Sequence, residues 1–143
     1  MQVKEIMTKN VITVTAQAKL KEVARIFKEH RINGVPVVNK KNEVIGIITL
    51  TDMLKMLKDI HLLNKEENNA SETLEMKECL IEEKENATVN MKMSNQVWSV
   101  EEDADIDYVL ELMCEHNIHT IPVLKNRILV GIIGATDIVD ACI

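Results

Sequence analysis

The chain has 143 residues and a formal net charge of −6, and 46% of its residues are hydrophobic although it holds one Trp, one Tyr and one Phe. This composition excludes a disordered chain, and the acidic balance disfavours a surface that binds nucleic-acid phosphates. No apolar run reaches the ~18 residues that span a bilayer, and the N-terminus lacks the layout of a signal peptide, so we expect a cytoplasmic protein that does not contact the membrane.

The second half of the chain repeats the first. The segment GIITLTD at 46–52 recurs as GIIGATD at 131–137, and upstream of it ten further residues recur at one constant spacing, from Met7 and Met93 onwards. A duplicated unit predicts two pseudo-symmetric binding sites. Each copy has about 55 residues, a size at which a lone domain is marginal, so we expect the copies to share one core.

A short extended run at 11–14 opens the first copy, and an amphipathic helix follows it. Apolar residues at Leu20, Val23, Ala24 and Phe27 have helical spacing, and the second copy repeats the pattern. The repeated positions are Ile106, Val109, Leu110 and Met113, with Asp103 expected to cap the helix. We expect the two helices to end at His30 and His116, where a cation meets the negative end of the helix dipole.

Each copy continues with a predicted hairpin. The strands are expected at 34–38 and 43–48 in the first copy and at 120–124 and 128–133 in the second, with polar turns between them. Pro36 and Pro122 cannot donate to a strand ladder, so each is expected to open a strand or lie on an edge.

A second helix is predicted from Thr51-Asp52, with Met53, Leu54, Met56, Leu57 and Ile60 facing inward. Its counterpart from Thr136-Asp137 must end within about two turns. The connector at 61–87 contains eight Glu and three Lys, which favours a solvated link. Its capping box at 69–72 and the apolar residues Leu74, Cys79, Leu80 and Ile81 predict a further helix.

The order strand, helix, hairpin, helix resembles the CBS domain family. The resemblance rests on Ile6-Met7-Thr8 before the first strand, on Val35-Pro36-Val37 in the hairpin, and on the closing motif, each of which recurs in related form in the second half. It implies an α/β fold of two pseudo-symmetric β-α-β-β-α units packed through their sheets, with CBS domains at 1–60 and 88–143 and a connector at 61–87.

The same resemblance implies a function. In this family adenine nucleotides (AMP, ADP or ATP) are the commonest ligands, bound between the copies; the Asp of the closing motif holds the ribose hydroxyls and the Thr three residues earlier touches ribose or phosphate. Asp52 and Thr49 would take these roles in one site and Asp137 in the other. A carboxylate suits a vicinal diol, and a helix N-terminus suits phosphate. The alternative is that Thr49, Thr51 and Asp52 only cap the helix.

The two sites are expected to differ because Gly134 stands where the first copy has Thr49. We therefore expect Asp52→Ala to lower nucleotide affinity more than Asp137→Ala. His119 is the basic group expected near phosphate, and Trp98 is expected to report on the second site. The remaining ligand contacts implied by the resemblance are Thr13, Val14, Asn33, Gly34, Val35, Pro36, Ser99, Val100, Thr120, Ile121, Pro122 and Thr136.

Three other kinds of function compete with this interpretation. A zinc site at Cys114, His116 and His119 is disfavoured because residues two apart do not share a helical face. An enzyme is disfavoured because no catalytic motif is present. A scaffold without a nucleotide remains open, as does S-adenosylmethionine as the ligand. We expect no required cofactor or metal, a homodimer, and an effector protein that the sequence does not identify.

The cysteines point to a reduced protein. Cys79, Cys114 and Cys142 are odd in number and lack CxxC spacing, which disfavours a disulfide framework. We expect them to be buried as small hydrophobic side chains.

Overall fold

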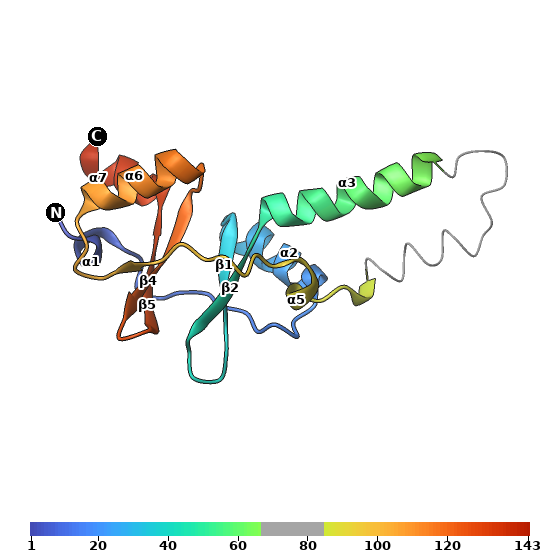
Figure 1. The fold of residues 1–143 in the computed structure, drawn as a ribbon, viewed down its shortest axis with the longest axis horizontal. Coiled ribbons are helices and arrows are strands. Elements are labelled where there is room, and N and C mark those ends of the chain that lie inside the picture. The colour runs from blue at the N-terminus through green and yellow to red at the C-terminus, as the bar shows by residue number, and fades with distance from the viewer. Residues whose placement is uncertain (67–84) are drawn as a thin grey trace.

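The computed structural model describes residues 1–66 and 85–143. Two α/β units lie side by side, and α3 extends away from the first of them (Figure 1). The predicted fold class and pseudo-symmetry are confirmed. The first unit comprises α2 (Leu20–His30), β1 (Gly34–Val38), β2 (Val44–Thr49) and α3 (Leu50–Glu66). The second comprises β3 (Val100–Glu101), α6 (Ile106–His116), β4 (Thr120–Lys125), β5 (Ile128–Gly134) and α7 (Ala135–Cys142).

Both amphipathic helices end where predicted, at His30 and His116. The next residues, Arg31 and Asn117, adopt the left-handed conformation with φ of 52° and 51°, a common way to end a helix. The predicted cap at Asp103 is wrong. Asp105 caps α6, and its carboxylate accepts a hydrogen bond from the backbone N–H of Asp107 at 2.9 Å, because a cap must directly precede the first helical residue.

The strands pair as two small sheets. β1 and β2 are antiparallel, whereas β4 pairs in parallel with β3 and antiparallel with β5. Of the extended run predicted at 11–14, Val14 alone bridges to Val37.

Pro36 and Pro122 lie inside β1 and β4 rather than at their starts. The predicted edge position is confirmed for Pro36, because β1 is an edge of a two-stranded sheet, and is wrong for Pro122, because β4 is the central strand of its sheet. Pro36 faces Ile47 and Pro122 faces Ile132, and these isoleucines direct their backbone N–H groups to Ser94 and Thr8 at 3.0 and 2.9 Å. Because these isoleucines bond to Ser94 and Thr8, the proline positions are not hydrogen-bonded to β2 or β5. The absence of a proline N–H therefore removes no hydrogen bond between the paired strands.

The expectation of one shared core is wrong. The described residues form two apolar clusters, one in each unit. Each cluster is completed by a short helix that precedes the other copy: Val3 of α1 (Val3–Ile6) is buried in the second core, and Val89 of α5 (Val89–Lys92) in the first. Figure 1 shows α1 beside α6 and α7, and α5 close to α2.

Equivalent backbone hydrogen bonds hold the two exchanged segments. The backbone N–H of Val3 donates to Ala104 at 2.9 Å, and that of Val89 donates to Ala18 at 2.8 Å. Thr8 bridges to Ile132 of β5, and Ser94 bridges to Ile47 of β2. Each sheet is thus extended by the segment that leads into the other copy.

The buried faces of the helices differ in part from prediction. In α3, Met53 and Met56 are buried, but Leu54 is 63% and Leu57 44% exposed. Ile60 lies outside the residues with described side chains. The reason is that α3 projects beyond the unit, so one narrow face packs against the core (Figure 1).

The buried faces of α2 and α6 also differ slightly from prediction. Ala24 and Leu110 are exposed, and the positions two residues later, Ile26 and Leu112, pack against the cores instead.

Three further observations concern the surface. Cys114 and Cys142 are exposed, contrary to the expectation of burial. Cys79 and the helix predicted after the capping box at 69–72 lie outside the described residues, whereas α3 itself continues over 61–66.

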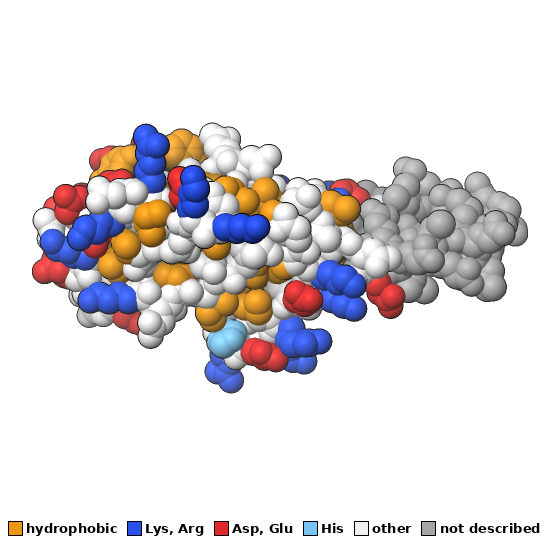
Figure 2. Space-filling model, turned by 90° about the horizontal axis from the view of Figure 1, so that it is seen from below, with side chains coloured by type: hydrophobic (Ala, Val, Ile, Leu, Met, Phe, Trp, Pro, Cys, Tyr) orange, Lys and Arg blue, Asp and Glu red, His pale blue; other side chains and the backbone are white. Residues whose placement is uncertain are grey.

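Within the described part, every helix is too short or too polar to cross a bilayer. On the face shown in Figure 2, basic and acidic side chains are interspersed around hydrophobic ones.

Candidate functional site

Two clefts lie between the units, and each begins at the closing motif of one copy. The first, the Asp52 cleft, has a volume of about 600 Å³. Its lining residues are Asn33, Ile47, Thr49, Leu50, Thr51, Asp52, Ser94, Gln96, Trp98, Asn117, Ile118, His119 and Thr120.

The second, the Asp137 cleft, has a volume of about 350 Å³. Its lining residues are Thr8, Asn10, Val11, Ile12, Arg31, Ile32, Asn33, Gly34, His119, Thr120, Ile132, Gly134, Ala135, Thr136 and Asp137.

Each cleft combines the closing motif of one copy with the leading segment of the other. Trp98 of the second copy lines the Asp52 cleft, and its repeat counterpart Ile12 lines the Asp137 cleft. Likewise, Asn117 lines the Asp52 cleft and its repeat counterpart Arg31 lines the Asp137 cleft. The exchange of leading segments therefore places walls from both copies around each cleft.

Asp52 and Thr49 hold the start of α3. Asp52 Oδ2 accepts hydrogen bonds from the Thr49 backbone N–H at 2.8 Å and from the Thr49 hydroxyl at 3.0 Å. Thr49 Oγ1 accepts in turn from the Asp52 backbone N–H at 3.3 Å. The pair is thus a reciprocal helix cap.

The second copy keeps part of this cap. Asp137 Oδ2 accepts from the Gly134 backbone N–H at 2.8 Å, but glycine offers no hydroxyl. Within residues 1–66 and 85–143 the capping bonds use Oδ2 of both aspartates and none uses Oδ1. Each carboxylate therefore keeps an oxygen that can accept from a ligand.

Asn33 and His119 form a partition that belongs to both clefts. The carbonyl of Asn33 accepts from the backbone N–H of Leu50 at 2.9 Å, and that of His119 accepts from Ala135 at 2.8 Å. These donors are the first residues of α3 and α7, so the partition is tied to both helix N-termini.

The structure brings together about half of the predicted site residues. Those that line a cleft are Asn33, Gly34, Thr49, Thr51, Asp52, His119, Thr120, Thr136 and Asp137. Buried positions elsewhere are Val14, Val35, Pro36, Val100, Ile121 and Pro122. Thr13 is half-buried and Ser99 exposed, and neither lines a cleft.

Two cleft residues, Trp98 and Arg31, depart from the sequence prediction. Trp98 lines the Asp52 cleft, so the expectation that it reports on the second site is wrong. Arg31 lines the Asp137 cleft and was missed. The available sequence signal was a basic residue directly after the helix predicted to end at His30, two positions before the predicted site residue Asn33.

The cluster considered for zinc does not form a metal site. His116 stacks on Trp98 rather than joining Cys114 and His119. In the part of the chain that the structure describes, no three His, Cys, Asp or Glu side chains are grouped to hold a metal ion.

Comparisons with known proteins agree with the duplicated architecture. The family model of the CBS domain matches residues 3–59 and 87–143. The chain is 30% identical over 137 residues to the L-aspartate semialdehyde sulfurtransferase of Methanocaldococcus jannaschii, covering 95% of this chain but 22% of that protein. It is 30% identical over 156 residues to protein MJ1426 of the same organism, covering 100% of this chain and 92% of that protein.

Solved structures give the same result. The CBS domain pair of protein MJ0100, in complex with 5′-methylthioadenosine and S-adenosyl-L-methionine, superimposes with a TM-score of 0.77 at 28% identity, covering 99% of this chain and 98% of that one. Protein MJ1225 of M. jannaschii gives a TM-score of 0.80 at 25% identity, covering 98% of this chain and 47% of that one. The chain belongs to the CBS domain family and is a tandem CBS pair.

Proposed function

We propose that this CBS pair is a regulatory module without catalytic activity, which binds an adenosine-containing ligand between its copies and signals to a partner protein. Adenine nucleotides (AMP, ADP or ATP) are the first candidates. The observation that carries the proposal is the placement of Asp52 and Asp137, each at a helix N-terminus in a cleft walled by both copies.

The chemistry of the aspartates fits a ribose. One oxygen of each carboxylate holds the helix cap, and the other can accept from the ribose hydroxyls in a charge-assisted hydrogen bond. The cleft volumes of about 600 and 350 Å³ fall in the range of roughly 300–1,000 Å³ that is usual for small-molecule sites.

The same arrangement supports binding rather than catalysis. Asp52 and Asp137 lie in separate clefts, so they do not form an acid–base pair across one substrate. A ligand that touches both walls shifts the orientation of the copies through its different affinity for each arrangement. The change reaches an effector through the surface of the module.

S-adenosylmethionine is the second candidate ligand. It is supported by the 28% identity to the MJ0100 pair, whose structure holds 5′-methylthioadenosine and S-adenosyl-L-methionine. Both compounds carry the ribose diol that the aspartates suit.

A homodimer is part of the proposal. Leu54 and Leu57 present exposed apolar side chains on α3, as Val139 does on α7. Light scattering with and without ligand tests for the dimer.

Isothermal titration calorimetry with AMP, ATP and S-adenosylmethionine tests the ligand, on the natural chain and on Asp52→Ala and Asp137→Ala. Saturable binding that weakens in the variants supports the proposal. Asp140→Ala on exposed α7 is the matched control and should leave affinity unchanged. If none of the three compounds binds the natural chain, the scaffold function replaces this one.

A further inference from the structure

The two clefts differ in charge at one position of the repeat. Arg31 follows α2 and lines the Asp137 cleft, whereas Asn117 follows α6 and lines the Asp52 cleft. Their backbones are nearly the same, with φ and ψ of 52° and 46° for Arg31 and of 51° and 47° for Asn117. At this position the clefts therefore differ in the side chain and not in the backbone conformation.

Arg31 is available to bind an anion. In the described residues the salt bridge joins Lys125 to Glu102, and Arg31 takes part in none. A guanidinium binds phosphate through paired hydrogen bonds. Thr136 lines the same cleft at the start of α7 and adds a hydroxyl.

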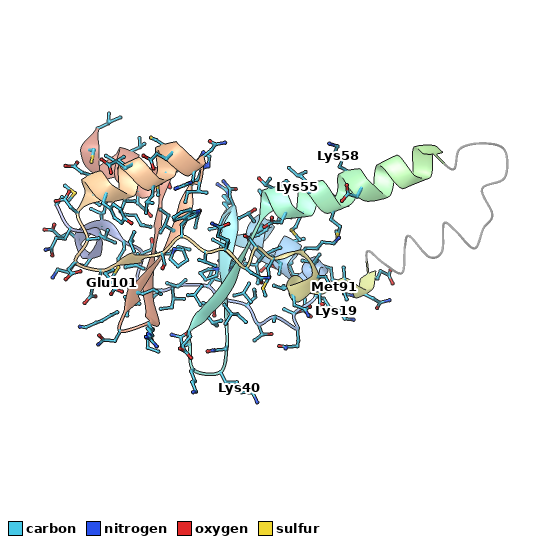
Figure 3. The ribbon with its side chains drawn as sticks, viewed as in Figure 1. Lys19, Lys40, Lys55, Lys58, Met91 and Glu101 are labelled. Carbon is cyan, nitrogen blue, oxygen red and sulfur yellow. The ribbon has the colours of Figure 1, made fainter. Side chains whose placement is uncertain are left out.

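The Asp52 cleft lacks a cation that corresponds to Arg31. Its lining contains no Lys or Arg, and its charged side chain is the carboxylate of Asp52. Lys55 and Lys58, labelled in Figure 3, lie farther along α3 and do not line the cleft. A phosphate placed here would meet this negative charge without a Lys or Arg partner. His119 lines both clefts, so it does not distinguish them.

Apolar and aromatic side chains form one part of that lining, beside uncharged polar ones such as Thr49 and Gln96. Ile47, Leu50 and Ile118 are apolar, and Trp98 offers an aromatic ring. Such a lining suits an uncharged thioether, and an aromatic ring beside a carboxylate also suits a sulfonium cation.

We infer that the two clefts select different adenosine derivatives: the Asp137 cleft takes a 5′-phosphorylated nucleoside through Arg31, and the Asp52 cleft takes one whose 5′ substituent is uncharged or cationic. This inference rests on the proposed function. It also makes the loss of affinity in the aspartate variants depend on the ligand. Asp137→Ala should weaken AMP binding more than Asp52→Ala does, and Asp52→Ala should weaken 5′-methylthioadenosine binding more.

The test exchanges the two residues. Arg31→Asn and Asn117→Arg each install the residue that the other copy carries, so the backbone conformation is retained. AMP and 5′-methylthioadenosine are titrated calorimetrically into both variants and into the natural chain, and circular dichroism checks that each variant is folded. Trp98 emission reports separately on the Asp52 cleft.

Arg31→Asn is expected to weaken AMP binding about tenfold or more, the effect of losing a charge-assisted hydrogen bond, and to change 5′-methylthioadenosine affinity by less than about twofold, since that ligand has no phosphate. Asn117→Arg is expected to create AMP binding that Trp98 detects.

Unchanged AMP affinity in Arg31→Asn, with AMP still bound, would overturn this inference and leave the proposed function intact. A Trp98 response to AMP in the natural chain that saturates with the calorimetric signal would do the same. Failure of both compounds, and of ATP and S-adenosylmethionine as well, to bind the natural chain would overturn the proposed function itself.

Discussion

The indole ring of Trp98 stacks on the imidazole of His116, with ring centroids 3.9 Å apart and planes inclined by 17°. Trp98 is the one tryptophan of the chain, and it lines the Asp52 cleft. His116 is the last residue of α6. The natural fluorophore is therefore held in place at the wall of one cleft and is absent from the other.

Trp98 emission should change when a ligand fills the Asp52 cleft, because a bound ring or ribose alters the polarity around the half-buried indole. Asp52→Ala should weaken the ligand-dependent change in parallel with the calorimetric affinity, and Asp137→Ala should preserve it. Steady-state fluorescence titration with 5′-methylthioadenosine measures both. An undiminished response in Asp52→Ala would show that Trp98 does not report on that cleft.

Thr49→Ala should lower the free energy of unfolding by about 1 kcal/mol, the usual cost of losing an N-cap side chain. The hydroxyl of Thr49 both donates to and accepts from Asp52, so its loss weakens the start of α3. Urea unfolding followed by circular dichroism measures the change. Thr51→Ala is the matched control, since Thr51 is exposed and takes part in no described capping bond; an equal loss there would contradict the assignment.

Val89→Ala should lower the free energy of unfolding by about 2 kcal/mol, because two buried methyl groups are removed. Val89 is fully buried in the first core, while Trp98 packs against the second. Since α5 joins the units, the unfolding midpoint followed by Trp98 emission should fall as well. Val139→Ala, at a 52% exposed position, should change stability by less than about 0.5 kcal/mol. A Trp98 transition unaffected by Val89→Ala would mean that the units unfold independently.

Gly46→Ala should destabilise the fold by about 1–3 kcal/mol through overpacking. A Cβ at Gly46 would lie 2.6 Å from Met93 Sδ and 3.0 Å from the Ser94 carbonyl oxygen. Removing the sulfur with Met93→Ala should lessen the added cost of Gly46→Ala, but the backbone contact should retain some of it. A double-mutant cycle by urea unfolding measures this coupling. Gly34→Ala, whose nearest contact would be 3.4 Å, should cost less; equal costs at both glycines would contradict the packing argument.

The architecture was largely readable from the sequence because its signals are local and occur twice. Strand β1 occupies the predicted residues 34–38, and the helices end at the predicted histidines. The buried face of α3 was over-predicted since Leu54 and Leu57 are apolar yet lie one position beyond the buried Met53 and Met56, on a neighbouring face of the helix. Hydrophobic spacing shows which residues share a face but not how far the neighbouring core extends.

The sites were harder to predict because their walls come from both copies. The closing motifs placed Thr49, Asp52, Thr136 and Asp137 at the clefts, but the sequence alone does not reveal which leading segment faces which motif. That pairing depends on the exchange of α1 and α5, whose four-residue lengths give no clear periodic pattern. Trp98 was assigned to the other cleft for this reason.

The exchange of α1 and α5 also bears on the ancestry of such a chain. A single copy would leave empty the place that the leading helix of its neighbour fills, and its own leading helix would find no partner. Two identical single-copy chains could each supply what the other lacks, as in domain swapping. An ancestor that preceded the duplication would thus have been complete as a pair of chains. Fusion made the exchange internal, and one half could then acquire Arg31 while the other carried Asn117.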